Sequence, residues 1–345
     1  MKEKRHEVLY RAYRPASFKE VRGQAHVVDV LEKAVKNKQV AHAYLFAGSR
    51  GTGKTSVARI LARELGVSDK DLYEIDAASQ TGVENIRELR EAVNVMPFDS
   101  PYRFYIIDEA HMLSRNAWNA FLKTLEEPPA HAIFVLATTE RDKIPETIQS
   151  RCEIYSFKQP TREMLADVVS DVAKREGFSL ERSAAELVAL LAEGSFRDAL
   201  GILQKVLSIS EHKKVDVGEV EAVSGAPRGE LVRQLLEAIA KKDAGAALNV
   251  VRTAVSENMD ARTLAKLLIH RMRVVLLMRY APELAGSFSK EMTEADLALA
   301  KALSKEPGVN SEMLKALLEA YSQMAYAAVP HLPLELAVVD IAEKG

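Results

Sequence analysis

A glycine-rich run of eight residues constrains the fold of this 345-residue chain more than any other feature. Gly48-Ser49-Arg50-Gly51-Thr52-Gly53-Lys54-Thr55 fits the pattern G-x-x-x-x-G-K-[ST], and Ser56 follows directly. An apolar stretch, Tyr44–Ala47, precedes the run, and a helical pattern begins at Lys54. Because the pattern is meaningful only between a strand and a helix, this context predicts a loop that binds phosphate groups.

The residue types in the run suit a nucleoside triphosphate. Glycines allow backbone N–H groups to curl around phosphate oxygens, and the helix N-terminus adds partial positive charge. Lys54 is expected to neutralise the β- and γ-phosphates, while the Thr55 hydroxyl is expected to bind Mg²⁺. The alternative is a glycine-rich turn that fits the pattern by chance, which the flanking strand and helix disfavour.

Two adjacent carboxylates follow another apolar run. Phe104–Ile107 leads into Asp108 and Glu109. Since neighbouring residues of a strand point in different directions, Asp108 can hold Mg²⁺ while Glu109 deprotonates the attacking water. These separate roles imply that the nucleotide is hydrolysed and not merely bound. The alternative is a pair of acids in a solvated turn, but that would not explain the apolar run. His111 and Trp118, further along, are expected to be core residues without a chemical role.

The first half of the chain alternates strands with helices, which predicts an α/β fold with a parallel sheet covered on both faces. The expected strands are Tyr44–Ala47, Leu72–Ile75, Phe104–Ile107, Ile133–Ala137 and Ile154–Phe157. The expected helices lie near 27–38, 54–65, 83–95 and 114–126.

Beyond Pro160 the pattern is helical, with no convincing strand. Thr161 is a candidate helix cap, and Ser183 to Glu186 fits a capping box. Val223 to Pro227 marks a further boundary. We therefore expect a sheet domain over 1–160, a helical lid over 161–222 and a helical collar that mediates oligomerisation over 223–345.

Composition and charge exclude several classes. The single cysteine, Cys152, excludes an internal disulfide and a cysteine-rich zinc site. No apolar run is long enough to span a membrane, and the first residues do not resemble a leader peptide, so we expect a cytoplasmic protein. Residues 1–63 carry a net charge of +9 and the remainder −11. Such a basic front fits either phosphate binding or a solvated surface.

The order of these motifs matches AAA+ ATPases, and their wording resembles the bacterial DNA polymerase III gamma/tau clamp-loader family. The matching segments, within residues 7 to 205, are HAYLFAGSRGTGKTS, EIDAAS, IIDEAHMLS, NAFLKTLEEPP, LATT, IPETIQSRC and GSFRDAL. Replication factor C small subunits are similar to a lesser degree. This family commonly carries a four-cysteine zinc module after the first P-loop helix, but here Leu65–Lys70 leads directly to the next strand. The module is absent, and we expect no zinc.

The resemblance implies three further residues of the ATPase site. Thr139, at the end of the strand that begins at Ile133, corresponds to the first sensor, which contacts the γ-phosphate or the attacking water. Arg151, within Ser150-Arg151-Cys152, corresponds to the arginine that reaches the nucleotide of a neighbouring subunit. Arg197, in a helix that Ser195 can cap, corresponds to the second sensor. Each has an alternative: Thr139 can be an ordinary threonine at a strand end, Arg151 a solvated arginine, and Arg197 an arginine on a helix surface.

A segment near the N-terminus resembles the part of the family that surrounds adenine. The resemblance implies contacts from Arg11, Tyr13, Arg14, Pro15 and Val21. Proline stiffens the segment, and Tyr13 and Val21 offer apolar surface. The alternative is that this segment only packs the first helix on the sheet.

The family also implies partners: other clamp-loader subunits in a hetero-oligomeric ring, a sliding clamp and primer-template DNA. Gln80 and Val83 stand where relatives often have basic residues. We expect Ser79, Thr81 and Lys143 to contact the DNA phosphates instead, and such contacts do not read the base sequence. The apolar tip Val95–Phe98 either faces the clamp or packs as a small satellite of the core.

The expected function is therefore that of an ATPase motor subunit of the DNA polymerase III clamp loader, with ATP/ADP and Mg²⁺ as ligands. One alternative is a AAA+ DNA remodeller such as a branch-migration motor, which the wording of the motifs disfavours. Another is a non-hydrolysing scaffold subunit of the same complex. Because a scaffold needs none of Lys54, Asp108 and Glu109, their presence together disfavours that alternative.

Overall fold

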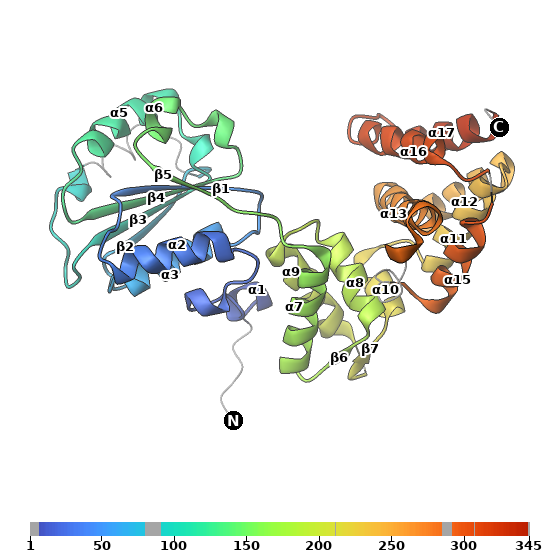
Figure 1. The fold of residues 1–345 in the computed structure, drawn as a ribbon, viewed down its shortest axis with the longest axis horizontal. Coiled ribbons are helices and arrows are strands. Elements are labelled where there is room, and N and C mark those ends of the chain that lie inside the picture. The colour runs from blue at the N-terminus through green and yellow to red at the C-terminus, as the bar shows by residue number, and fades with distance from the viewer. Residues whose placement is uncertain (1–6, 80–90, 211, 285–291, 307, 344–345) are drawn as a thin grey trace. The chain divides into compact units, whose positions relative to one another are not determined.

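The computed structural model describes residues 7–79, 91–210, 212–284, 292–306 and 308–343. Gln80, Thr81 and Val83 lie outside these residues, as does most of the helix expected near 83–95. The described chain forms two compact units, drawn in Figure 1: residues 1–165 with 192–201, and residues 166–191 with 202–345.

The first unit is built on a five-stranded parallel sheet, as the sequence predicts. The strands, in the spatial order β2-β3-β4-β1-β5, are β1 (Ala43–Ala47), β2 (Leu72–Asp76), β3 (Arg103–Asp108), β4 (Ala132–Thr138) and β5 (Glu153–Ser156). Each boundary lies within one residue of its expected position. The central strands β1 and β4 are buried along their whole length, which explains why their sequences are apolar without alternation.

Helices cover both faces of this sheet (Figure 1). They are α2 (Ala25–Lys36) and α3 (Lys54–Glu64) on one face, and α5 (Arg115–Glu126) and α6 (Glu146–Gln149) on the other. Alternate residues of a strand serve the two faces: Tyr44 and Phe46 pack with α2 and α3, whereas Leu45 packs with α5. Trp118 lies in the α5 core, as expected. Burial of each large side chain contributes about 1.5–3 kcal/mol to folding.

Short elements complete the first unit. They are α1 (Leu9–Ala12) and the 3₁₀ turns η1 (Phe18–Glu20), η2 (Ala110–Met112) and η3 (Arg141–Lys143), together with the start of α9 (Phe196–Ile209). Because β1 lies next to β4, and β4 next to β3, the segments that follow these three strands meet at one edge of the sheet.

The apolar tip does not pack on the core, so the satellite-core interpretation is wrong. Val95, Met96 and Phe98 are 55%, 70% and 72% exposed. The backbone at Phe98 is nevertheless fixed, because its N–H donates to Oδ1 of the buried Asp71 at 2.7 Å. Lys70 Nζ lies 4.3 Å from the centre of the Phe98 ring. An anchored backbone thus presents exposed apolar side chains.

Among its described residues, the second unit is helical apart from one short pairing of strands. Its helices are α8 (Arg182–Leu191), α10 (Val217–Ser224), α11 (Gly229–Ala240), α12 (Ala244–Ser256), α13 (Ala261–Tyr280), η4 (Pro282–Leu284), α15 (Glu294–Leu303), α16 (Ser311–Gln323) and α17 (Leu332–Glu343), with most of α7 (Arg162–Arg175) and α9. The strands β6 (Ser179–Leu180) and β7 (Lys214–Val215) pair in parallel. Two residues are too few to produce the alternation that signals a strand.

One expected helix cap is displaced. Ser183 was expected to open a helix, but α8 already begins at Arg182. The N–H of Glu181 donates to Val215 O at 3.0 Å, and Glu181 O accepts from Ala185 N at 2.9 Å. The helix therefore starts directly after the β6–β7 pairing. Thr161 does cap α7, since its hydroxyl accepts from Met164 N at 3.2 Å.

Short polar side chains define the helix starts of the C-terminal region. Those that accept from backbone N–H groups in the first turn are Asp216, Asp243, Asp260, Thr293 and Asn310. Within the described residues, no helix is both long enough and apolar enough to cross a membrane.

Candidate nucleotide-binding site

The glycine-rich run forms a loop between β1 and α3. Gly51 has a φ of +72°, and a Cβ added there would collide with the hydroxyl of Ser195. Gly53 has a φ of +101°, and a Cβ there would meet no atom within 4 Å. Glycine is therefore needed at both positions for conformation, and at Gly51 also for close packing. The space beside Gly53 stays open, as a phosphate-binding loop requires.

Lys54 is buried inside this loop. Its ammonium donates to Gly48 O at 2.7 Å and Ser49 O at 3.0 Å. Burial lowers the pKa of Lys54, whereas the nearby charges of Glu109 and Asp108 raise it and Arg197 lowers it further.

The adjacent acids Asp108 and Glu109, at the end of β3, face different partners. Asp108 Oδ2 accepts from the Thr55 hydroxyl at 2.8 Å. Glu109 Oε2 accepts from the Thr139 hydroxyl at 3.3 Å. Glu109 has a φ of +48°, a left-handed conformation that is uncommon for a residue with a side chain. This backbone turn directs the second carboxylate toward Thr139, the residue after β4.

The Thr55–Asp108 pair fits a magnesium site. A hydroxyl and a carboxylate beside a phosphate loop are oxygen donors of the kind that Mg²⁺ prefers, and Mg²⁺ usually takes only one or two protein ligands. Among the described residues, no group of three or more His, Cys, Asp or Glu side chains could hold a metal ion. The hydroxyl of Thr55 and the carboxylate of Asp108 suit an ion that completes its coordination with water and phosphate oxygens.

His111 belongs to the site, although the sequence predicts only a core residue. Its Nδ1 lies 3.1 Å from Thr138 Oγ1 and 3.5 Å from Glu109 Oε2, and its Nε2 lies 3.3 Å from Glu140 Oε1. The side chain is 8% exposed. A single histidine after two acids gives no periodic signal, and only the convergence of β3 and β4 shows its contacts.

The start of α9 closes over the phosphate loop. The Ser195 hydroxyl accepts from Asp198 N at 3.1 Å, which confirms the expected cap. Phe196 N donates to Gly51 O at 3.0 Å, so the helix start is joined to the loop. The Arg197 guanidinium lies 5.7 Å from the centre of the Tyr10 ring.

The N-terminal segment supplies further cations. Burial lowers the pKa of Arg14, and the positive charges of three other arginines lower it further: Arg59, Arg197 and Arg11. The negative charge of Glu74 acts in the opposite direction and raises it. Such mutual repulsion would be relieved by an anion. Of the other predicted contacts, Val21 packs against the α2–α3 core, Tyr13 and Pro15 are half-buried, and Arg11 is exposed.

Gln24 is a second residue whose structural role the sequence did not reveal. It is fully buried, donates to Lys158 O at 2.7 Å and accepts from Lys158 N at 3.1 Å. Gln159, next along the chain, donates to Ser49 Oγ at 3.0 Å. The segment after β5 is thus fixed against the start of α2 and the phosphate loop.

Arg151 is not among the groups gathered around the phosphate loop. Its guanidinium pairs instead with Glu126 at 2.7 Å and with Thr147 O at 2.7 Å. These partners belong to α5 and α6. Arg151 and the loop residues therefore occupy different parts of the first unit.

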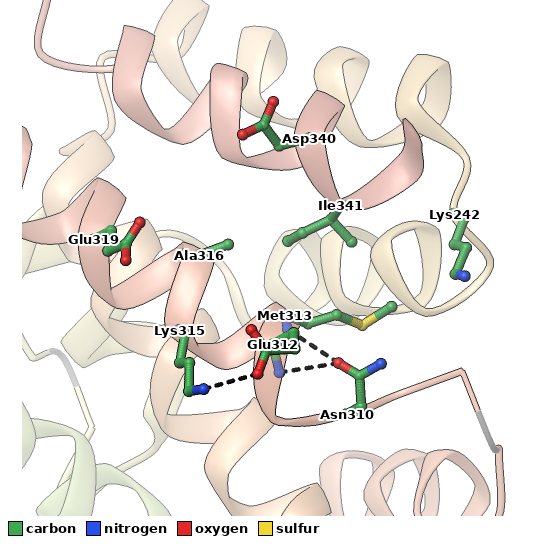
Figure 2. Close-up of a pocket in the computed structure, with 9 residues that line it drawn as sticks. All are labelled: Lys242, Asn310, Glu312, Met313, Lys315, Ala316, Glu319, Asp340 and Ile341. Carbon is green, nitrogen blue, oxygen red and sulfur yellow. Dashed lines mark hydrogen bonds and ion pairs between the residues drawn. The ribbon is translucent and has the colours of Figure 1, made fainter. Parts of the chain in front are cut away.

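A separate hollow of about 290 Å³ lies in the C-terminal unit (Figure 2). Its lining residues are Lys242, Asn310, Glu312, Met313, Lys315, Ala316, Glu319, Asp340 and Ile341. Lys315 pairs with Glu312 at 2.8 Å, and Asn310 caps α16. Lys315, Glu312 and Asn310 therefore stabilise the start of α16.

Comparisons with known proteins extend this picture. The family profile described as "DNA polymerase III, delta subunit" matches residues 23–74 and 67–161, and that of "DNA polymerase III subunits gamma and tau domain III" matches 215–344. The chain is 35% identical to DNA polymerase III subunit tau of Bacillus subtilis, over 98% of this chain and 63% of that one. The corresponding protein of Escherichia coli is 32% identical, over 97% and 55%.

Among solved structures, the Thermotoga maritima RuvB Holliday junction branch migration motor is similar in fold, with a TM-score of 0.53 and 23% identity. The likeness covers 66% of this chain and 79% of that one. The strand order, with the phosphate loop after β1, the two acids at the end of β3 and Thr139 after β4, is that of the AAA+ fold. The chain belongs to the DNA polymerase III gamma/tau family. It spans less than two thirds of the length of these tau relatives.

Proposed function

We propose that this chain is an ATP-hydrolysing motor subunit of a DNA polymerase III clamp loader, which uses ATP to load a sliding clamp onto primed DNA. One observation carries the proposal: Thr55, Asp108, Glu109 and Thr139 converge beside the phosphate loop in a member of the gamma/tau family. A scaffold subunit would need neither acid.

Nucleotide binding begins with the loop from Gly48 to Ser56, whose N–H groups surround the phosphates. Lys54 exchanges the carbonyl oxygens of Gly48 and Ser49 for β- and γ-phosphate oxygens. The adenine lies against the N-terminal segment. The residues assigned to that contact are Arg11, Tyr13, Arg14, Pro15 and Val21.

Hydrolysis depends on the two acids acting separately. Thr55 and Asp108 hold Mg²⁺, which when bound neutralises charge on the β- and γ-phosphates. Glu109 orients the attacking water and takes its proton. Thr139, which already donates to Glu109, is placed to hold the same water or the γ-phosphate. Arg197 contacts the nucleotide from the start of α9.

Assembly completes the site. Arg151 contacts the nucleotide bound to a neighbouring subunit, because its fixed charge and forked donors match phosphate oxygens. We assign residues 1–160 to the ATPase domain, 161–222 to the lid and 223–345 to the collar through which subunits associate. The match of the domain III profile to residues 215–344, which begins eight residues before the expected boundary, supports a distinct C-terminal domain.

The partners follow from this role. The chain joins other loader subunits in a hetero-oligomeric ring, grips the DNA backbone without reading bases and contacts the clamp, all in the cytoplasm. The exposed side chains of Val95, Met96 and Phe98 supply a clamp contact. Differential affinity of the ATP and ADP states for clamp and DNA drives the cycle.

The test is ATP turnover by the purified chain with its partner subunits, cognate clamp and primed DNA. We expect clamp and DNA together to stimulate turnover. Glu109→Gln should lower turnover by about 10²–10⁴-fold while nucleotide binding survives. Arg151→Ala should abolish the stimulation, since such arginines contribute on the order of 10³-fold or more.

Arg115→Ala, at an exposed arginine at the start of α5, is the matched control for Arg151→Ala and should leave turnover unchanged. Turnover that ignores the clamp but drives branch migration would replace the proposal with a DNA remodeller. Loader activity that survives Glu109→Gln in full would favour a scaffold role.

A further inference from the structure

The guanidinium of Arg151 is held on several sides. Nη2 donates to Glu126 Oε1 at 2.7 Å, and Nη1 donates to Thr147 O at 2.7 Å and to Ser150 Oγ at 3.3 Å. Thr147 and Ser150 belong to the same short turn as Arg151. Glu126, the last residue of α5, is 25 positions away in sequence. It is therefore the one of these three acceptors that ties the arginine to another element.

Both ends of the Glu126–Arg151 pair rest on rigid backbone. Leu125 of α5 and Ile148 of α6 are buried in the same core cluster. Gln149 further fixes the turn, because its amide donates to Ile144 O at 2.9 Å and accepts from Arg141 Nε at 3.0 Å. The positions of the carboxylate and the arginine backbone are thus set by the fold.

The pair contributes little to stability, so its effect must be sought elsewhere. The side chains of Arg151 and Glu126 are 34% and 47% exposed. Ion pairs as exposed as this one are weak. What the pair does change is the freedom of a long side chain, since an unrestrained arginine loses substantial rotamer entropy when it must adopt one geometry.

We infer that Glu126 is a positioning residue that holds Arg151 ready to contact the nucleotide of a neighbouring subunit. The inference rests on the proposed function. A guanidinium has five N–H donors. In the described part of the chain three of them have acceptors, which leaves two for phosphate oxygens. Glu126 itself touches no reacting atom.

The test separates the subunit that donates the arginine from the subunit that hydrolyses ATP. Loader complexes are assembled from wild-type chains and an excess of carrier chains with Lys54→Ala, whose own sites are inactive. Turnover then comes from wild-type sites, many of which receive Arg151 from a carrier. Four substitutions are compared in the carrier: Glu126→Ala, Glu126→Gln, Arg151→Ala and Glu127→Ala, the last at the exposed neighbouring glutamate.

Glu126→Ala in the carrier should lower kcat at the wild-type sites roughly two- to fivefold, while their nucleotide affinity stays unchanged. Glu126→Gln should retain part of the rate, because the amide oxygen still accepts from Arg151. Glu127→Ala should have no effect. In a carrier that already has Arg151→Ala, Glu126→Ala should cause no further loss, which an independent structural role would not predict.

The failures are distinguishable. If Arg151→Ala lowers turnover and Glu126→Ala behaves like Glu127→Ala, the positioning role is wrong and the proposed function stands. If Glu126→Ala raises turnover, the carboxylate restrains the arginine instead, which also overturns the inference. If Arg151→Ala in the carrier leaves turnover unchanged, Arg151 does not act on a neighbouring subunit, and both that role and the positioning role of Glu126 are wrong.

Discussion

Thr55 donates a 2.8 Å hydrogen bond from its hydroxyl to Oδ2 of Asp108, which joins the first turn of α3 to the end of β3. The two side chains come from motifs 53 residues apart. The contact places both oxygen donors of the proposed magnesium site within reach of one ion.

Replacing Thr55 by Ala should therefore raise the Mg²⁺ concentration needed for half-maximal turnover by at least about tenfold. Thr55→Ser keeps the hydroxyl and should stay close to wild type. Titration of turnover with Mg²⁺ measures the effect, and Glu64→Ala, at an exposed residue at the far end of α3, is the control. A Thr55→Ala enzyme with an unchanged Mg²⁺ requirement would remove Thr55 from the metal site.

His111 offers a second prediction, because its ring lies between the carboxylates of Glu109 and Glu140. Without its ring, Glu109 loses a neighbour that restricts its orientation. His111→Ala should lower kcat roughly tenfold with little change in nucleotide affinity, as expected when a supporting contact of a catalytic group is removed. His111→Asn keeps a polar atom near the position of Nδ1 and should recover part of the rate.

Steady-state turnover and equilibrium binding of a fluorescent ATP analogue separate these quantities. Met112→Ala, at an exposed neighbour, is the control. Loss of nucleotide binding in His111→Ala, together with a lowered melting temperature, would show that the histidine is needed only for folding.

Asp71 leads to a prediction about pH and stability. Burial raises the pKa of this carboxyl, but hydrogen bonds from the backbone N–H groups of Phe98, Asp99 and Ser100 outweigh burial and lower the pKa below its ordinary value of 3.8. A carboxyl with a lowered folded-state pKa stabilises the fold above its ordinary pKa. That contribution is lost as the pH falls from 3.8 through the folded-state value.

The free energy of unfolding should therefore be lower for Asp71→Asn than for wild type at about pH 6, and the gap should narrow at about pH 3. Urea unfolding at both values measures it. Asp69→Asn, at an exposed carboxylate nearby, should show no such gap. A gap for Asp71→Asn that is independent of pH would mean that the loss comes from packing.

The sheet and the phosphate loop were predictable because they are local patterns. Apolar runs located all five strands, and the glycine-rich motif located the start of α3. His111 and Gln24 were not predictable as parts of the site, because their partners lie on segments brought together only by the sheet. The exposed tip at Phe98 was ambiguous, since apolar residues in a loop do not reveal whether Asp71 anchors the backbone beneath them.

The pairing of Lys143 with Glu140 bears on the proposed grip on DNA. Lys143 Nζ lies 2.8 Å from Glu140 Oε2, and the Lys143 side chain is 60% exposed. The hydrogen bond from Lys143 lowers the pKa of Glu140, because it favours the carboxylate form. A DNA phosphate bound to Lys143 would therefore compete with Glu140 for the ammonium.

If Lys143 contacts the backbone, Lys143→Ala in the assembled loader should weaken DNA binding alike for all sequences. It should also reduce the slope of log K against log salt by about 0.9, because one fewer counterion is released. Glu140→Gln should strengthen binding, since it frees the lysine. Fluorescence anisotropy of labelled primed DNA over a range of salt measures both, with the exposed Lys123→Ala as control. An unchanged slope in Lys143→Ala would exclude this lysine from the DNA surface, because the charge it removes would then release no counterion.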